Sequence, residues 1–204
     1  MIDPSTASPL LRELNDALAL EGAAPVEWII CGGTALQIQG LAQRTTRDID
    51  VIAGRSPVTL ELVPLTRFAP AIERAIDRVS SAHPDLRSGD LRWVNLGPRR
   101  LIESGLPPGF TDRLQPLVVG KHLTLHLPAR IDLLAFKLFA AADARCSRQH
   151  IHQADFMALV PTEAEIRFAI DWILTTPDPN HSLRAELRGF LKDIGHDDHA
   201  YYIA

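Results

Sequence analysis

Two carboxylates stand one residue apart in the stretch "RTTRDIDVIA", at Asp48 and Asp50. The alternation and the β-branched residues predict a strand, in which side chains two positions apart share a face, with Cα atoms roughly 7 Å apart. Such carboxylates can converge on one hard divalent cation or on a pair of them, which relieves the repulsion between the anions. The alternative is that Arg44 and Arg47 neutralise them as surface ion pairs, each contributing about 0 to 1 kcal/mol.

A glycine pair precedes the aspartates, between the apolar run "VEWIIC" and a helical pattern. Gly32 and Gly33 therefore occupy a strand-to-helix turn, where free N–H groups and the helix dipole can hold a phosphate and a missing Cβ permits close approach. Thr34 can add a hydroxyl donor, and Arg44 a cation. The alternative is that the glycines only form the turn, because neither G-x-x-x-x-G-K-[ST] nor G-x-G-x-x-G is present. An anion site beside two metal-binding carboxylates is what phosphoryl transfer requires.

The segment "IICGGTALQIQG", followed by "RTTRDIDV", resembles the signature of polymerase-beta-like nucleotidyltransferases. In that superfamily a hydrophobic residue and Gly-Gly or Gly-Ser precede an Asp-hydrophobic-Asp pair on the next strand. Fourteen residues, 34–47, separate Gly33 from Asp48, a spacing at the long end for the superfamily. The more specific resemblance is to bacterial AbiEii-like and related minimal nucleotidyltransferases, because a second region, residues 128–160, resembles them in addition to residues 30–51. The resemblance implies Mg²⁺ or Mn²⁺ held by Asp48 and Asp50, and a nucleoside triphosphate as substrate.

A single lysine interrupts the apolar helical pattern "RIDLLAFKLFAAADAR". Lys137 has no carboxylate three or four positions away, so its ammonium must be satisfied from outside its own helix. It can extend along its stem to water, or it can contact a bound triphosphate. The resemblance implies the second role, because AbiEii-like enzymes carry a lysine on this helix, then an arginine, then an aspartate on the next helix. Lys137, Arg145 and Asp155 stand in that order.

A histidine occupies the position one turn before Asp155, where the AbiEii-like family often has an acidic residue. His150 and His152 have no evident third or fourth metal ligand in the sequence, and we expect His152 to contact or cap Asp155. Two further histidines near the end of the chain, His196 and His199, are expected to lie in a solvated tail.

The carboxylate that activates the attacking hydroxyl in polymerase-beta-like enzymes is not assigned by the sequence. Asp90 precedes a predicted strand, "LRWVNL", Asn95 within that strand would be a neutral substitute, and Asp132 begins the lysine helix. By resemblance to relatives of AbiEii, Asp155 is a candidate for the base or for an orienting residue.

The elements that must position these residues are those of an α/β (α+β) fold. We expect a first helix capped by Ser8 and ended by Gly22, strands at residues 26–31 and 48–53, and a helix at about 34–40. Residues 58–81 read as mostly helical, "LRWVNL" and "LTLHL" as strands, and residues 97–110 as a strand or turn followed by an irregular loop. Two helices are expected at about residues 131–145 and 153–159. A capping box of Thr162 and Glu165 is expected to begin a third, and a last helix is expected to begin at Ser182 and to end at Gly195. Together these predict a mixed β-sheet flanked by helices, a nucleotidyltransferase-like core at residues 1–127, and a helical region packed on it at residues 128–204.

Composition restricts the class of protein. The 204 residues carry a net charge of −4, which argues against electrostatic coating of nucleic acid. A local basic patch requires the fold to gather seven side chains that are otherwise scattered surface charge: Arg44, Arg47, Arg99, Arg100, Arg113, Lys121 and Arg130.

No apolar run approaches the roughly 18 residues of a membrane span, and the N-terminus lacks a signal-peptide pattern, so we expect a cytoplasmic protein without a membrane partner. The two cysteines, Cys31 and Cys146, are expected to be reduced thiols.

These features predict a magnesium-dependent nucleotidyltransferase that moves a nucleoside monophosphate from a nucleoside triphosphate to an acceptor hydroxyl. The acceptor would be RNA, a protein or a small molecule, and the resemblance implies a toxin-antitoxin or phage-defence setting with a cognate antitoxin as partner. The alternative is a catalytically inactive nucleotidyltransferase fold that binds a nucleotide or a partner. A metal-dependent phosphohydrolase ranks last, because no histidine ligands accompany the Asp-x-Asp pair.

Overall fold

The structure is a computed structural model that describes residues 7–46, 48–86, 92–143, 146, 148–178 and 182–203. Arg47, Asp90 and Arg145, which the sequence analysis names, lie outside the described residues. The chain divides into two compact units, the first formed by Met1–Glu103 with Arg113–Pro128 and the second by Ser104–Asp112 with Ala129–Ala204.

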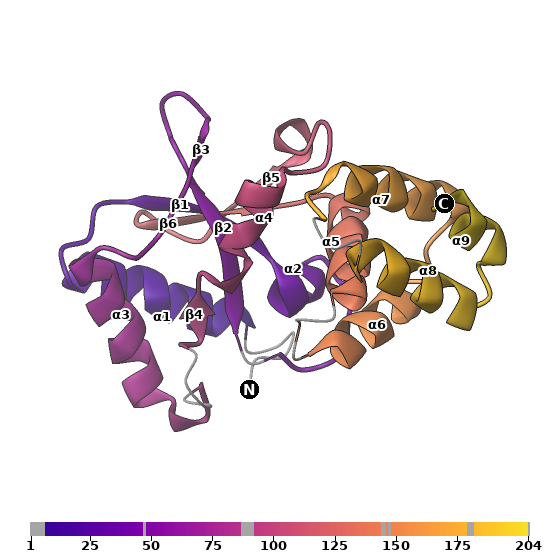
Figure 1. Cartoon of the computed structure of the whole chain (residues 1–204). Coiled ribbons are helices and arrows are strands. Elements are labelled where there is room, and N and C mark those ends of the chain that lie inside the picture. Colours follow the sequence, from indigo (N-terminus) through magenta and orange to yellow (C-terminus); the bar gives the residue numbers. More distant parts are fainter. Residues whose placement is uncertain are drawn as a thin grey trace. The chain divides into compact units, whose positions relative to one another are not determined.

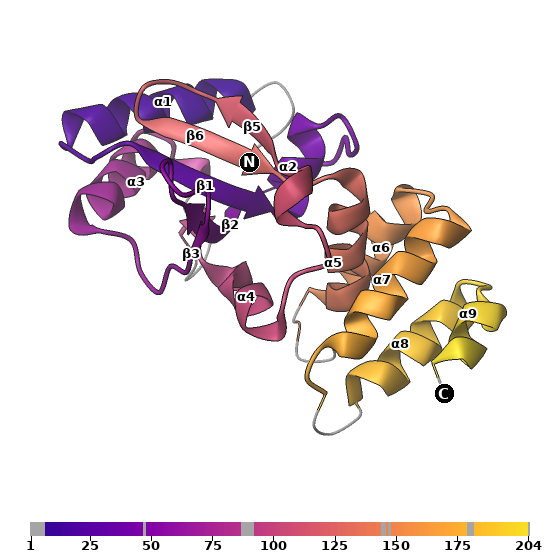
Figure 2. The same cartoon turned by 90° about the horizontal axis from the view of Figure 1, so that it is seen from above.

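The first unit is built on a mixed β-sheet, as the sequence predicts (Figures 1 and 2). In the described residues its strands are β1 (Val26–Cys31), β2 (Ile49–Arg55), β3 (Leu62–Val63), β4 (Val94–Asn95), β5 (Gln115–Val118) and β6 (Leu123–Leu127). Their order is β3-β2-β1-β6-β5, and β4 pairs with β2. β1 is antiparallel to β2 and parallel to β6, whereas β4 is parallel to β2. Because the end of β1 and all of β4 pair with the first residues of β2, the start of β2 lies between β1 and β4.

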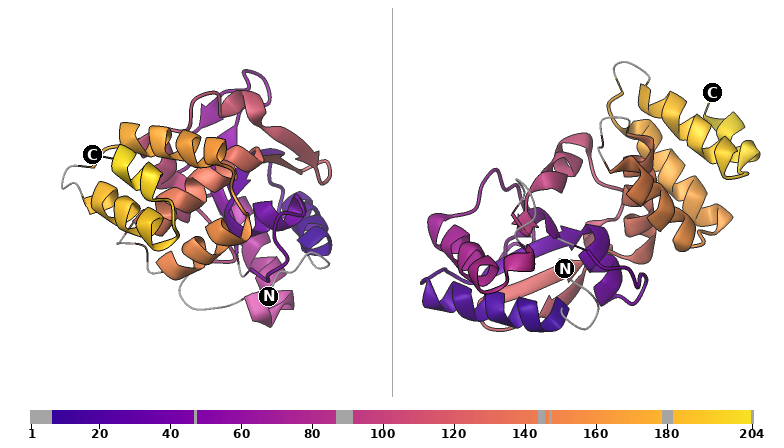
Figure 3. Two further views of the ribbon diagram at one scale, coloured as in Figure 1. Left: turned by 90° about the vertical axis from the view of Figure 1, so that its right-hand side faces the viewer. Right: turned by 90° about the horizontal axis from the view of Figure 1, so that it is seen from below.

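The helices of the first unit are α1 (Ala7–Leu20), α2 (Gly32–Ile38), α3 (Pro70–Ala82) and the short α4 (Arg100–Ser104). α1 and α3 pack side by side on one face of the sheet (Figures 1 and 3). The predicted first helix is present, and its leucines at positions 10, 11, 14 and 18 are buried. Ser8 lies inside α1, so its predicted capping role is wrong, whereas Gly22 ends the helix with φ +69°.

Several predictions for the middle of the chain are wrong. Residues 58–69 are not helical and contain β3, and Pro70 begins α3 at a position where proline's missing N–H costs nothing. Residues 97–99 form a 3₁₀ turn, in agreement with the predicted strand or turn, but α4 follows where an irregular loop was expected. The other 3₁₀ turns are Pro84–Leu86 and Thr111–Arg113. In the described part of "LRWVNL", residues 92–96, the strand is Val94–Asn95, whereas "LTLHL" is β6 as predicted.

The second unit consists of helices packed around α5 (Arg130–Ala142). The others are α6 (Gln149–Ala158), α7 (Glu163–Thr175), α8 (Ser182–Asp193) and α9 (Asp197–Tyr202), of which α8 and α9 lie side by side (Figure 3). The segment Ser104–Asp112 belongs to this unit through Phe110, whose ring lies 5.7 Å from that of Phe136. The carbonyl of Gly105 also accepts a hydrogen bond from the indole of Trp172 at 3.0 Å.

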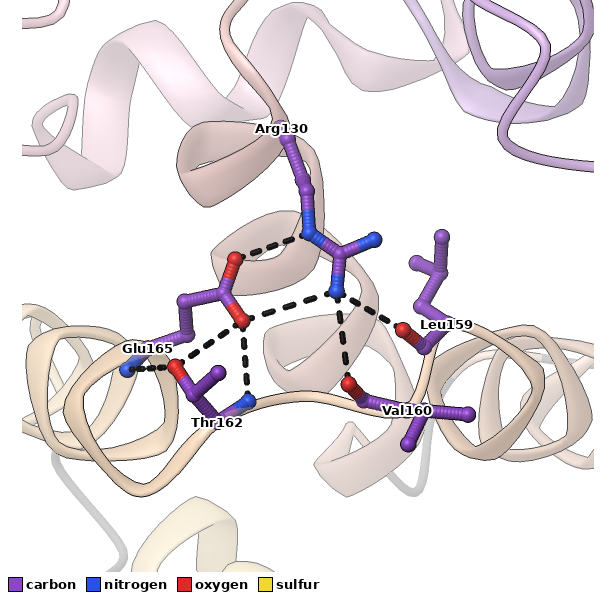
Figure 4. Close-up of polar contacts among 5 residues, drawn as sticks. All are labelled: Arg130, Leu159, Val160, Thr162 and Glu165. Atoms are coloured by element: carbon purple, nitrogen blue, oxygen red, sulfur yellow. Dashed lines mark hydrogen bonds and ion pairs between the residues drawn. The ribbon is translucent and has the colours of Figure 1, made fainter.

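The start of α7 confirms the predicted capping box. The Thr162 hydroxyl accepts a hydrogen bond from the Glu165 backbone, and the Glu165 carboxylate accepts one from the Thr162 backbone. Figure 4 shows that Arg130 donates to the same carboxylate at 2.9 Å and to the carbonyl of Leu159 at 2.7 Å. The first residue of α5 thereby fixes the turn that precedes α7.

The expectation of a solvated tail is wrong. His196 and His199 lie at the start of α9 and within it, and His199 is buried. Among the residues that the structure describes, no helix is long and apolar enough to cross a membrane.

Candidate functional site

The bend between β1 and α2 is shaped around the carboxylate of Asp50. Gly32 has φ +73°, and a Cβ placed on it would lie 2.2 Å from Oδ2 of Asp50. Antiparallel pairing of Cys31 with Asp50 brings the two strands to this register. A side chain at position 32 would be strained by the backbone and would collide with the carboxylate, so glycine is required here for both reasons.

The amide of Asn95 fixes the other side of the Asp50 carboxylate. β4 pairs Asn95 with Asp50, and Nδ2 of Asn95 donates to Oδ1 of Asp50 at 3.1 Å. Oδ1 of Asn95 accepts a hydrogen bond from the Gly97 backbone at 2.7 Å, which determines which way the amide points. Asn95 is the neutral residue predicted in place of a third carboxylate, and its amide cannot take a proton from a substrate hydroxyl.

Asp48 lies just before β2 and is 9% exposed. The buried hydroxyl of Thr34 donates to its backbone carbonyl at 2.7 Å, and the hydroxyl of Thr46 lies 3.3 Å from its Oδ1. Thr34 therefore positions Asp48 in this structure, and its role toward a phosphate stays a prediction.

Gly33 is covered by two polar side chains from the connection that precedes β2. A Cβ placed on Gly33 would lie 2.8 Å from the hydroxyl oxygen of Thr46 and 3.2 Å from a guanidinium nitrogen of Arg44. The exposed Arg44 thus has its charge beside the glycine pair. Sequence reasoning missed Thr46, although its position two residues before Asp48 was a usable signal.

The first unit therefore brings together six predicted site residues: Gly32, Gly33, Thr34, Arg44, Asp48 and Asp50. The donor set that faces this bend fits a hard cation, because carboxylate oxygens are the ligands that Mg²⁺ and Mn²⁺ prefer. Asp50 presents its carboxylate directly on the bend, where the neutral amide of Asn95 donates to it.

The other two predicted residues form an ion pair within the second unit. Nζ of Lys137, on α5, lies 2.7 Å from Oδ2 of Asp155, on α6, and both side chains are at least 95% buried. The expectation that the lysine is satisfied from outside its own helix is confirmed, and the alternative that it extends to water is wrong. His152 Nδ1 lies 3.5 Å from the same ammonium.

The remaining sequence candidates belong to both units. Asp132 is fully buried in α5, which argues against contact with a substrate hydroxyl. Arg130, one of the seven basic-patch residues, is engaged by Glu165 and by the end of α6 in the second unit. Arg44, Arg99, Arg100, Arg113 and Lys121 belong to the first unit.

A family model described as "Nucleotidyltransferase of unknown function (DUF6036)" matches residues 9–164. The chain belongs to this family. The match spans the glycine bend, the Asp-x-Asp pair, Lys137 and Asp155, and it ends within the first turn of α7. Nucleotidyltransferases in general use a nucleoside triphosphate and a divalent metal ion, which are the classes of ligand that the carboxylates and the glycine bend fit. No curated protein matches the chain.

Proposed function

We propose that this chain is a Mg²⁺- or Mn²⁺-dependent enzyme that transfers a nucleoside monophosphate from a nucleoside triphosphate to an acceptor hydroxyl. The observation that carries the proposal is the carboxylate of Asp50 resting on the Gly32 bend, with Asp48 two residues before it and the Arg44 guanidinium beside Gly33. Family membership supplies the reaction class.

Each residue has a proposed role. Asp48 and Asp50 would hold the divalent ion, which supplies Lewis-acid stabilisation of the charge that develops on the phosphates. The backbone of Gly32 and Gly33 would receive the triphosphate, and Arg44 would neutralise part of its charge. Thr34 and Asn95 would hold the two aspartates in place. The acceptor hydroxyl gives up its proton to a base as its oxygen forms a bond to the α-phosphorus, the bond from that phosphorus to the bridging oxygen breaks, and pyrophosphate leaves.

Lys137 and Asp155 stay in the proposal on the strength of the AbiEii-like resemblance. The lysine would contact the triphosphate, and the aspartate would orient the lysine or act as the base. The proposed acceptor is RNA, a protein or a small molecule, in a toxin-antitoxin or phage-defence setting with a cognate antitoxin.

The test is transfer of label from α-³²P nucleoside triphosphates to cell RNA or protein in the presence of Mg²⁺ or Mn²⁺. We expect a labelled acceptor with the wild type and none with Asp48→Asn or Asp50→Asn. Asp16→Asn, at an exposed aspartate on α1, is the matched control and should keep full activity. Transfer that survives both active-site substitutions contradicts the mechanism, and release of phosphate without a labelled acceptor indicates a phosphohydrolase instead.

One observation favours the second candidate, a nucleotide-binding module without turnover. The residue paired with Asp50 on β4 is Asn95, whose amide cannot act as a base. Titration calorimetry separates the two functions. Binding of Mg²⁺ and a nucleoside triphosphate that depends on Asp50, together with an absence of label transfer to any acceptor, would support the module.

A further inference from the structure

Three potential metal ligands converge where α7 and α9 begin, within the second unit. Glu163 is the first residue of α7, His196 directly precedes α9, and His199 lies within α9. One ligand atom from each residue lies within 4.8 Å of the other two. Nε2 of His199 contacts Oε2 of Glu163, and Nδ1 of His196 lies 3.6 Å from Oε1 of the same carboxylate.

The fold holds these residues in place from both sides. The capping box of Thr162 and Glu165 fixes the first turn of α7, on which Glu163 stands. The end of α9 is tied to α7 by the Tyr202 hydroxyl, which donates to Asp171 at 2.9 Å, and by Arg167, whose guanidinium carbon lies 3.6 Å from the centre of the Tyr202 ring. The cluster is therefore largely formed before any ligand binds, which lowers the entropy cost of binding.

An ordinary histidine–carboxylate ion pair explains only part of this arrangement. The contact between His199 and Glu163 satisfies both groups by itself. The second imidazole is aimed at the same carboxylate from 3.6 Å, which is too long for a hydrogen bond. A single ion bound between the three groups accounts for the convergence of both rings, whose centres are 5.9 Å apart.

Two imidazoles and one carboxylate form the donor set of zinc sites that keep an open position. Bonds of about 2.0–2.1 Å to a tetrahedral ion place neighbouring ligand atoms about 3.4 Å apart, a spacing that small side-chain rotations can reach from the present one. The side chain of Glu163 is 75% exposed, so an ion has a path to the cluster and a water can complete its coordination.

We propose that Glu163, His196 and His199 form a transition-metal site suited to Zn²⁺, which ties α9 to the start of α7. The nitrogen ligands distinguish it from the carboxylate site of the first unit, because Mg²⁺ prefers oxygen donors and Zn²⁺ accepts imidazole. Both histidines lie beyond residue 164, where the family match ends. The inference is therefore independent of the proposed nucleotidyl transfer.

The test is calorimetric titration of the full chain with ZnCl₂, in an Asp48→Asn/Asp50→Asn background that removes the proposed cation site of the first unit. We expect one Zn²⁺ per chain, and a loss of affinity of at least about tenfold when Glu163→Gln or His196→Ala is added. His83→Ala is the matched control, because His83 forms a 2.6 Å pair with Glu13 that has the same chemistry without a second histidine. This control should leave Zn²⁺ binding unchanged.

A second readout guards against variants that fail to fold. In imidazole-detected NMR spectra of the unsubstituted chain, Zn²⁺ should shift the ring resonances of His196 and His199 and leave those of His83 in place. The proposal is overturned if no Zn²⁺ binds, if Glu163→Gln and His196→Ala leave the affinity unchanged, or if His83→Ala reduces it equally.

Discussion

The two units hold their candidate-site carboxylates by different means. In the first unit, the donors that position Asp48 and Asp50 include a hydroxyl from Thr46 and an amide from Asn95, which hold a carboxylate without cancelling its charge. In the second unit, Asp155 meets the ammonium of Lys137 at 2.7 Å, and the pair is nearly neutral as a whole. The contacts described for the first unit come from neutral donors, whereas the second unit pairs two buried opposite charges, and removing either one would leave the other uncompensated. Substitutions of Asp48 or Asp50 should therefore change activity more than stability, whereas substitutions of the buried pair should lower stability whatever they do to transfer.

The largest expected effect is on activity in the first unit. Asp50→Asn should lower nucleotidyl transfer by about 10³-fold or more, because the metal's several kcal/mol of transition-state stabilisation are lost. The free energy of unfolding should change by less than about 1 kcal/mol, since the new side chain can still accept from Asn95 and the repulsion with Asp48 is reduced. Label transfer and urea unfolding on the same preparations measure both quantities. A loss of activity that merely follows a loss of folded protein would contradict the comparison.

The next effect is on stability in the second unit. Asp155→Asn or Lys137→Met should each lower the free energy of unfolding by about 3–5 kcal/mol, because each leaves a buried charge without its partner. The double variant Lys137→Met/Asp155→Leu should recover much of the loss in urea unfolding. Asp77→Asn is the control, since it breaks a half-exposed pair with Arg92 and should cost less than about 1 kcal/mol. Equal costs at positions 77 and 155 would show that burial of the second pair is unimportant.

A smaller effect is expected at the glycine bend. Gly22 and Gly32 have φ +69° and +73°, but a Cβ at Gly22 would meet nothing within 4 Å, whereas one at Gly32 would collide with Asp50. Gly22→Ala should cost about 1–2 kcal/mol from its backbone conformation. Gly32→Ala should cost more and should also weaken Mn²⁺ binding, measured by calorimetry. If the two substitutions have the same effect on stability and neither changes Mn²⁺ binding, the contact between Gly32 and Asp50 has no functional consequence.

The smallest effect is the loss, at low pH, of the stability that the Glu165 carboxylate contributes through the capping box of the second unit. Burial raises the pKa of Glu165, but hydrogen bonds from Arg130 and from the Thr162 backbone and hydroxyl outweigh it, so its pKa lies below the usual 4.5. The stability that the ionised carboxylate contributes is therefore present above about pH 4.5 and is lost as the pH falls through the lower pKa of the folded state. Glu165→Gln should cost about 1 kcal/mol at neutral pH, and the difference from the wild type should shrink in urea titrations below pH 4.5. A difference that stays constant to pH 3 would contradict this assignment.

Elements with a strong local pattern were predictable from the sequence. The apolar run "VEWIIC" is β1 with the predicted bounds, and the Thr162–Glu165 capping box does begin α7, because burial and capping are encoded within a few neighbouring residues. β3 and β4 are two residues long and exist through their pairing with β2. β5 contains Pro116 and a mostly exposed surface, so no alternation marks it.

In the candidate site, too, local patterns were predictable from the sequence and contacts between distant residues were not. Sequence spacing was enough to select the glycine pair and the two aspartates as residues that act together. The positions of Asn95 and of the Asp50 carboxylate on Gly32 depend on strand register, which joins residues 45 and 18 positions apart and leaves no local signal. The pairing of Lys137 with Asp155 likewise depends on the packing of α5 against α6.

The short segment Ser104–Asp112 has a practical consequence for dissecting the protein. Because Phe110 and the Gly105 carbonyl complete the packing of Phe136 and Trp172, the helical unit is assembled from two separated stretches of polypeptide. A fragment that starts at Ala129 would omit one of them and expose aromatic surface, so cutting the chain once cannot yield an intact helical half. Expression of separate halves would need a circularly permuted or relinked gene.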